Sequence, residues 1–153
     1  MSALLVPSDV KFIVLHITDS PYGDVATVDR WHKDNGWEGI GYHFLITNCF
    51  PTKYRWETKR PDVTFDGVLH AGRDITHRGA HVRGKNWQSV GVAMVGKNGS
   101  FTSKQIETAI NTCKDLLQDF PTATTVYGHF ELDDHKTCPD LDMDLFREWV
   151  FGS

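Results

Sequence analysis

The chain has 153 residues, of which 40% are hydrophobic and 24% charged, as in an ordinary globular protein with one core. Its formal net charge of −4 argues against a general nucleic-acid binder, which would usually be basic. Residues 1–10 lack the basic start and long apolar run of a signal peptide, and no stretch reaches the roughly 20 apolar residues of a membrane-spanning helix. We therefore expect a single domain over residues 1–153, with no membrane partner and no direct nucleic-acid partner.

The first half of the chain predicts two strands and one short helix. The predicted elements are a buried strand over residues 11–17, a helix from Val28 to Asn35 with Thr27 as its N-cap, and a strand over residues 42–47. Side chains alternate between the two faces of a strand, so Tyr42 and His43 point in opposite directions. Only one of them can face a given site.

The second half continues the alternation of strands and helices. A strand is predicted over residues 68–70 after the turn at Asp66-Gly67, and another over residues 89–95. Thr102 and Gln105 form a capping box for a long helix that Pro121 ends, and a short helix follows over residues 142–149. Strands interleaved with helices predict an α/β fold, in which helices are layered on a sheet.

A histidine and a cysteine suggest a metal site near the carboxyl end. Thr124, Thr125 and Val126 form a strand-like run that leads to His129, and Cys138 follows nine positions later. Imidazole and thiolate ligands favour zinc. The best candidate for a third ligand is His16, at the polar end of the first predicted strand, which would leave one open position on the metal. The alternative is that these histidines are ordinary core or surface residues.

The whole chain carries an ordered set of motifs that resembles one family. These motifs are His16, Trp31-His32-Lys33, Gly36-Trp37, Gly41-Tyr42-His43-Phe44, Ala71-Gly72-Arg73-Asp74, Ala80-His81, Ser89-Val90-Gly91-Val92 and Lys136-Thr137-Cys138-Pro139. They resemble the zinc N-acetylmuramoyl-L-alanine amidases related to peptidoglycan-recognition proteins, and most closely the short phage lysozymes of the T7 type. The resemblance implies a mixed central β-sheet flanked by helices, with one Zn²⁺ per chain in a groove on one face.

The resemblance also implies roles for particular side chains. His16, His129 and Cys138 would bind the zinc, Tyr42 and Lys136 would be catalytic, and His81 would contact substrate in the groove. Lys136 can stabilise an oxyanion and Tyr42 can hydrogen-bond the reacting amide or a water. The alternatives are an exposed surface lysine and a half-buried strand aromatic. His43 would then be a structural residue, and His135 would project away from the site.

Residues 48–67 depart from the T7-type pattern, in which the chain turns tightly at this point. This insertion mixes aromatic side chains with Lys and Arg, as in Tyr54-Arg55-Trp56. We favour a solvated hairpin extension here over a flap that contacts substrate. Either form would leave the metal ligands unchanged.

The resemblance predicts a phage endolysin that hydrolyses the amide bond between N-acetylmuramic acid and L-alanine in bacterial peptidoglycan. An odd number of cysteines suits a reducing compartment, so we expect the protein in the host cytoplasm until a separate pore protein releases it to the cell wall. One alternative is a peptidoglycan-binding module without activity, which the retained Cys138 disfavours. Another is a regulatory partner of a phage RNA polymerase, as implied by the T7-type relative.

Overall fold

A five-stranded mixed sheet organises the chain in the computed structural model, which describes residues 3–152. The strands are β1 (Phe12–Ile17), β2 (Phe44–Ile46), β3 (Leu69–Ala71), β4 (Ser89–Met94) and β5 (Thr125–Gly128), in the order β3-β2-β4-β1-β5. All neighbours are parallel except the edge strand β3, which is antiparallel to β2. The mixed central sheet that the resemblance implied is therefore confirmed.

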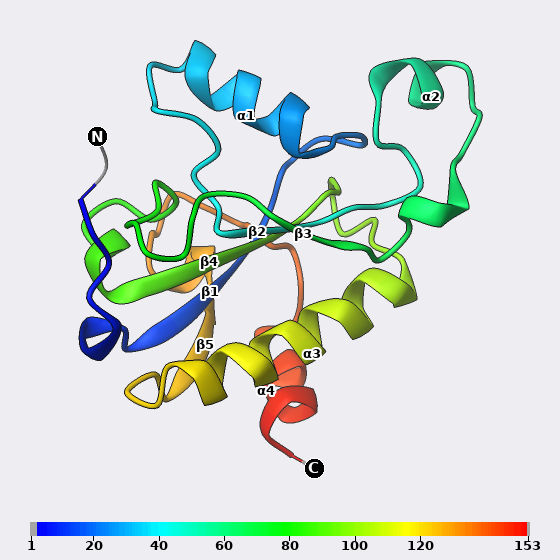
Figure 1. The fold of residues 1–153 in the computed structure, drawn as a ribbon. Coiled ribbons are helices and arrows are strands. Elements are labelled where there is room, and N and C mark those ends of the chain that lie inside the picture. The colour runs from blue at the N-terminus through cyan, green and yellow to red at the C-terminus, as the bar shows by residue number, and fades with distance from the viewer. Residues whose placement is uncertain (1–2, 153) are drawn as a thin grey trace.

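Helices cover both faces of this sheet (Figure 1). The α-helices are α1 (Val25–Asp34), α2 (Lys53–Glu57), α3 (Ser103–Asp119) and α4 (Met143–Phe151). Short 3-10 turns are η1 (Pro7–Asp9), η2 (Val63–Phe65), η3 (Asn86–Gln88) and η4 (His129–Glu131). Helix α1 lies on one face, α3 and α4 lie on the other, and α2 stands beyond the sheet (Figure 1). None of the helices that the structure describes is long and apolar enough to cross a membrane.

The central strand β1 shows how the sheet separates the core from the site. All six of its residues are buried. Ile13 and Leu15 belong to the main core with side chains of α3 and α4, whereas Phe12 and Val14 pack in a separate cluster. Because side chains alternate, His16 shares the face of Phe12 and Val14, away from α3 and α4.

Two local predictions are corrected by the structure. Helix α1 begins at Val25 rather than Val28, because the Asp24 carboxylate accepts the Thr27 backbone N–H at 2.8 Å and serves as the N-cap. The insertion forms α2 and η2 instead of a hairpin. Side chains of Thr52 and Asp62 cap these two turns, which favours helical geometry over strand pairing. The capping box of Thr102 and Gln105 on α3 is confirmed.

Candidate metal centre and active site

The pairing of β1 with β5 brings two of the proposed ligands together. Leu15 pairs with Gly128 in this parallel register, so His16 and His129 follow at neighbouring strand ends. Their ring centroids are 4.6 Å apart. His16 is 1% exposed, whereas His129 is partly exposed. The carboxyl edge of a parallel sheet is where α/β proteins commonly place ligands.

Cys138 completes the cluster from the loop before α4. Its Sγ accepts the Ile17 backbone N–H at 3.0 Å, and Phe130 N–H donates to the Cys138 carbonyl at 2.8 Å. One candidate ligand atom from each of His16, His129 and Cys138 lies within 4.8 Å of the others. Two imidazoles and one thiol at this spacing fit a zinc ion with a fourth position open.

Burial controls the protonation of these groups in the metal-free protein. It holds the pKa of His16 well below its usual range, and the nearby His81 and His129 lower it further. It raises the pKa of the Cys138 thiol to about 12. The neutral imidazole is ready to bind a metal, whereas the thiol must lose its proton when a metal binds.

His81 lies behind His16 and is 8% exposed. Its Nδ1 is 2.8 Å from Nε2 of His16, and its Nε2 is 3.3 Å from Oγ of Ser89. Gly91 on β4 makes room for this ring, since a Cβ at that position would lie 2.8 Å from Cγ of His81. Contact between His81 and substrate stays a prediction. The contacts of His81 with His16 and Ser89 fit a role in orienting the His16 ring.

The polarity of these hydrogen bonds assigns the tautomers. The Ser89 hydroxyl donates to the Lys85 carbonyl at 2.8 Å, so its oxygen accepts from Nε2–H of His81. Nδ1 of His81 is then the acceptor for Nε2–H of His16. This leaves Nδ1 of His16 as the nitrogen available to a metal.

A hollow of about 760 Å³ opens beside the cluster and contains Cys138, Tyr42 and Lys136 in its wall. The Tyr42 ring packs 5.1 Å from the His16 ring, and burial raises the pKa of its phenol above the ordinary value. Tyr42 therefore stays protonated and can donate a hydrogen bond. His135 also lines this hollow, which corrects the expectation that it projects away. The loop brings His135 and Lys136 to the same opening.

Hydrogen bonds made by two histidines, His32 and His43, fix the backbone around Tyr42. His43 is buried, accepts the Gly91 N–H at Nδ1 (3.0 Å) and contacts the His77 carbonyl through Nε2 (2.8 Å). His32 accepts the Gly41 N–H at 2.8 Å, and its ring packs edge-on to Tyr42 at 5.3 Å. These contacts agree with the structural role predicted for His43.

Comparison with known proteins identifies the family. The sequence matches the family model described as N-acetylmuramoyl-L-alanine amidase over residues 6–140. The chain belongs to this family. The amidase is 32% identical to the endolysin of Escherichia phage T7 over 131 residues, which are 81% of this chain and 74% of the relative. It is 31% identical to the endolysin of Enterobacteria phage K11 over 133 residues, covering 82% and 74% of the two chains.

Solved structures agree with this assignment. The N-acetylmuramoyl-L-alanine amidase LysC from Clostridium intestinale URNW aligns with a TM-score of 0.74 and 25% identity, covering 94% of this chain and 85% of LysC. Peptidoglycan recognition protein-LE in complex with tracheal cytotoxin aligns with a TM-score of 0.73, covering 97% and 85%, and at 20% identity it shows the fold alone. The expected family and fold are confirmed, and the amidase is of the phage endolysin type.

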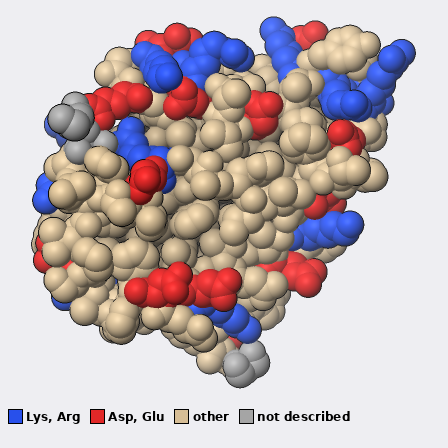
Figure 2. All heavy atoms as spheres, in the orientation of Figure 1, with Lys and Arg blue, Asp and Glu red and all other residues tan. Residues whose placement is uncertain are grey.

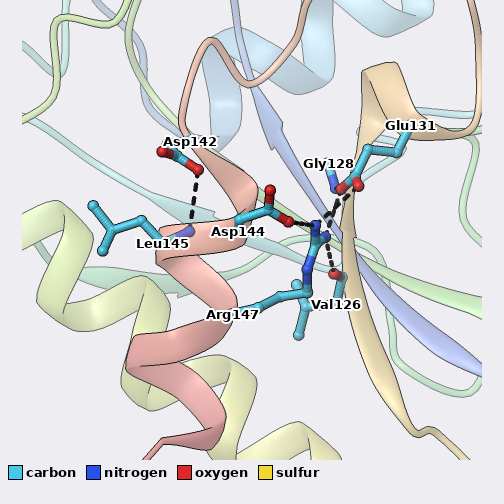
Figure 3. A network of polar contacts seen from close by, with 7 residues as sticks. All are labelled: Val126, Gly128, Glu131, Asp142, Asp144, Leu145 and Arg147. Atoms are coloured by element: carbon cyan, nitrogen blue, oxygen red, sulfur yellow. Dashed lines mark hydrogen bonds and ion pairs between the residues drawn. The ribbon is translucent and has the colours of Figure 1, made fainter.

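A charged network supports the His129 end of the amidase site (Figure 3). Arg147 on α4 donates to both carboxylate oxygens of Glu131, at 2.7 and 3.1 Å, and to the Val126 carbonyl at 3.0 Å. Glu131 in turn accepts the Gly128 N–H at 2.9 Å. The residues on both sides of His129 are thus attached to α4.

The sequence did not indicate every residue of the amidase hollow. Lys97 and Asn98 line it, although the stretch from Gly96 to Gly99 reads only as a turn. Their position in the chain could have indicated them, because this turn directly follows the central parallel strand β4. Arg73 does not line this hollow, and its guanidinium donates to the carbonyls of Ile40 and Arg78, both at 3.0 Å.

Proposed function

We propose that this amidase is zinc-dependent and cuts the bond between the lactyl group of N-acetylmuramic acid and L-alanine in peptidoglycan. The observation that carries the proposal is the cluster of His16, His129 and Cys138 at a hollow that also exposes Tyr42 and Lys136. Zinc bound to these residues would supply Lewis-acid activation of a water and of the amide carbonyl. One ion per chain is expected.

The protein's own side chains perform the remaining steps. The Lys136 ammonium stabilises the negative charge that develops on the carbonyl oxygen during hydrolysis. The Tyr42 phenol stays protonated and donates a hydrogen bond to the reacting groups. An amide needs both kinds of help, because resonance stabilises it and an amine is a poor leaving group.

Metal analysis and product analysis test this proposal. Purified protein should contain about one zinc per chain and should lose wall-clearing activity when chelator is added. Cys138→Ala should lose zinc and activity together. Digested walls should release L-alanine amino termini without new reducing sugars. Reducing ends without new amines would show a glycosidase, and full zinc in Cys138→Ala would refute the assigned ligands.

A peptidoglycan-binding module without catalysis is the second candidate function. The match to the N-acetylmuramoyl-L-alanine amidase family supports binding to the wall, and the complete ligand set favours catalysis in addition. The comparisons do not support an RNA polymerase partner, and we do not propose one.

The route from host cytoplasm to wall stays a prediction. Cells expressing this chain should lyse only when a pore-forming protein is expressed with it.

A further inference from the structure

A second hollow, of about 560 Å³, adjoins the active site. It shares Lys97 and Asn98 with the catalytic hollow, so the two are neighbours across the turn after β4. Its other side comes from the insertion, through Cys49, Phe50 and Trp56. The insertion therefore builds a surface directly beside the reaction centre.

The insertion is held firmly against the rest of the fold. Gly23 N–H donates to the Phe50 carbonyl at 2.9 Å, and within the insertion Asp62 N–H donates to the Cys49 carbonyl at 2.7 Å and closes the segment on itself. At its far end the Thr102 hydroxyl donates to the Asp66 carboxylate at 2.6 Å. A segment with these contacts can present side chains in fixed positions.

Trp56 is oriented by a row of aromatic rings. It stacks on Tyr22 with centroids 5.7 Å apart and 28° between the planes, and Tyr22 packs edge-on to Trp31 of α1 at 5.7 Å. Trp56 nevertheless stays 42% exposed and lines the second hollow. A half-exposed indole with a fixed orientation binds a flat apolar surface at little cost in side-chain entropy.

The two hollows differ in charge. The catalytic hollow has charged groups of both signs, from Asp19, Asp140, Lys97 and Lys136. Among the described residues that line the second hollow, Lys97 at the shared wall is the charged one, and the others are apolar, amide or hydroxyl side chains. Lys and Arg side chains gather over α2 in Figure 2, outside this lining.

This difference matches the two halves of the substrate. Under the proposed function, on which this inference rests, an uncharged glycan lies on one side of the scissile bond and a peptide with charged termini on the other. A pyranose ring offers a C–H face to an indole and offers hydroxyl and acetamido groups to Asn98 and Ser100. We propose that the second hollow is a subsite for the glycan beyond the muramoyl residue at the scissile bond, with Trp56 as its sugar-stacking residue.

The direct test is binding of a peptide-free β-1,4-linked tetramer of N-acetylglucosamine to the whole protein. Titration followed by NMR should shift the Trp56 indole N–H signal. Trp56→Ala should weaken binding roughly three- to tenfold, and Trp56→Phe should restore most of it. Tyr54→Ala is the matched control, because Tyr54 lies on the same helix, is 62% exposed and does not line the hollow. Unchanged affinity in Trp56→Ala, or no binding by the wild type, would overturn the subsite.

A kinetic test separates this inference from the proposed function. On polymeric glycan strands, Trp56→Ala should raise KM several-fold with little change in kcat, whereas a single muramoyl-peptide should be cleaved as by the wild type. An equal effect on both substrates would refute a subsite for the extended glycan. If the wild type cleaves neither substrate but binds the tetramer through Trp56, the proposed function fails and the subsite stands.

Discussion

Nε2 of His16 lies 2.8 Å from Nδ1 of His81, and both rings are buried. The hydrogen bond connects a proposed metal ligand to Ser89 and the Lys85 carbonyl behind it. It fixes which nitrogen of His16 faces the site. Partners of this kind commonly orient histidine ligands and make them more basic.

The first prediction concerns this contact. His81→Ala should weaken zinc affinity by roughly 10- to 100-fold, because the His16 ring loses its acceptor. His81→Asn should recover part of the affinity, since its side-chain oxygen can replace Nδ1. Competition with a chelator measures both values, and thermal unfolding of the metal-free proteins verifies that they are folded. A folded His81→Ala protein with wild-type zinc affinity would contradict the orienting role.

A second prediction concerns the charged contact behind His129. Arg147→Met keeps much of the side-chain volume but loses the paired hydrogen bonds to Glu131, so it should lower the free energy of unfolding by roughly 1–3 kcal/mol. Urea unfolding measures this change, and hydrogen exchange should rise at Gly128. Asp144→Asn is the control. Asp144 is 94% exposed, so its loss should change stability by no more than about 0.5 kcal/mol.

The third prediction separates catalysis from metal binding. Lys136→Ala should retain zinc but lower kcat by on the order of 10²–10³, as when an oxyanion donor is lost. Tyr42→Phe should have a similar or smaller effect, because water can replace part of its hydrogen bonding. Lys53→Ala on α2 is a control for the loss of a surface charge. Near-normal turnover in Lys136→Ala would move the oxyanion role to another donor, and His135 in the same hollow would be tested first.

The fourth prediction is a loss of stability in acid. Burial lowers the pKa of His43 from 6.5 to about 4, so between these values the unfolded chain binds more protons than the folded one. The contribution of His43 to the free energy of unfolding is complete above pH 6.5. It declines as pH falls toward 4, by on the order of 3 kcal/mol. His43→Asn should flatten the pH dependence of unfolding in chelator-treated protein. The dependence should remain in part, since buried His16 and His81 have lowered pKa values too.

An unchanged slope in His43→Asn would contradict this assignment. The side-chain amide of Asn does not titrate in this range, so any pH dependence that persists must come from other groups. A stability offset that is the same at every pH would report only lost hydrogen bonds to Gly91 and His77.

The sequence alone determined the features that depend on neighbouring residues. Helix α3 is an example. Its capping box, Thr102 with Gln105, and its apolar periodicity both come from residues that are near one another in the sequence. The ordered motifs also identified the family, and they predicted His16, His129 and Cys138 as ligands before any geometry was known. The start of α1 was wrong because Asp24 and Thr27 are both good N-caps, and only the backbone hydrogen bond chooses between them.

Only the tertiary structure decided how distant segments meet. Ile17 and Cys138 are 121 positions apart, and their contact depends on the parallel register of β1 with β5. The same long-range packing placed His81 behind His16, His135 at the hollow and the insertion beside the active site. Local propensity cannot determine these positions, because hydrogen bonding between strands and burial against remote side chains fix them.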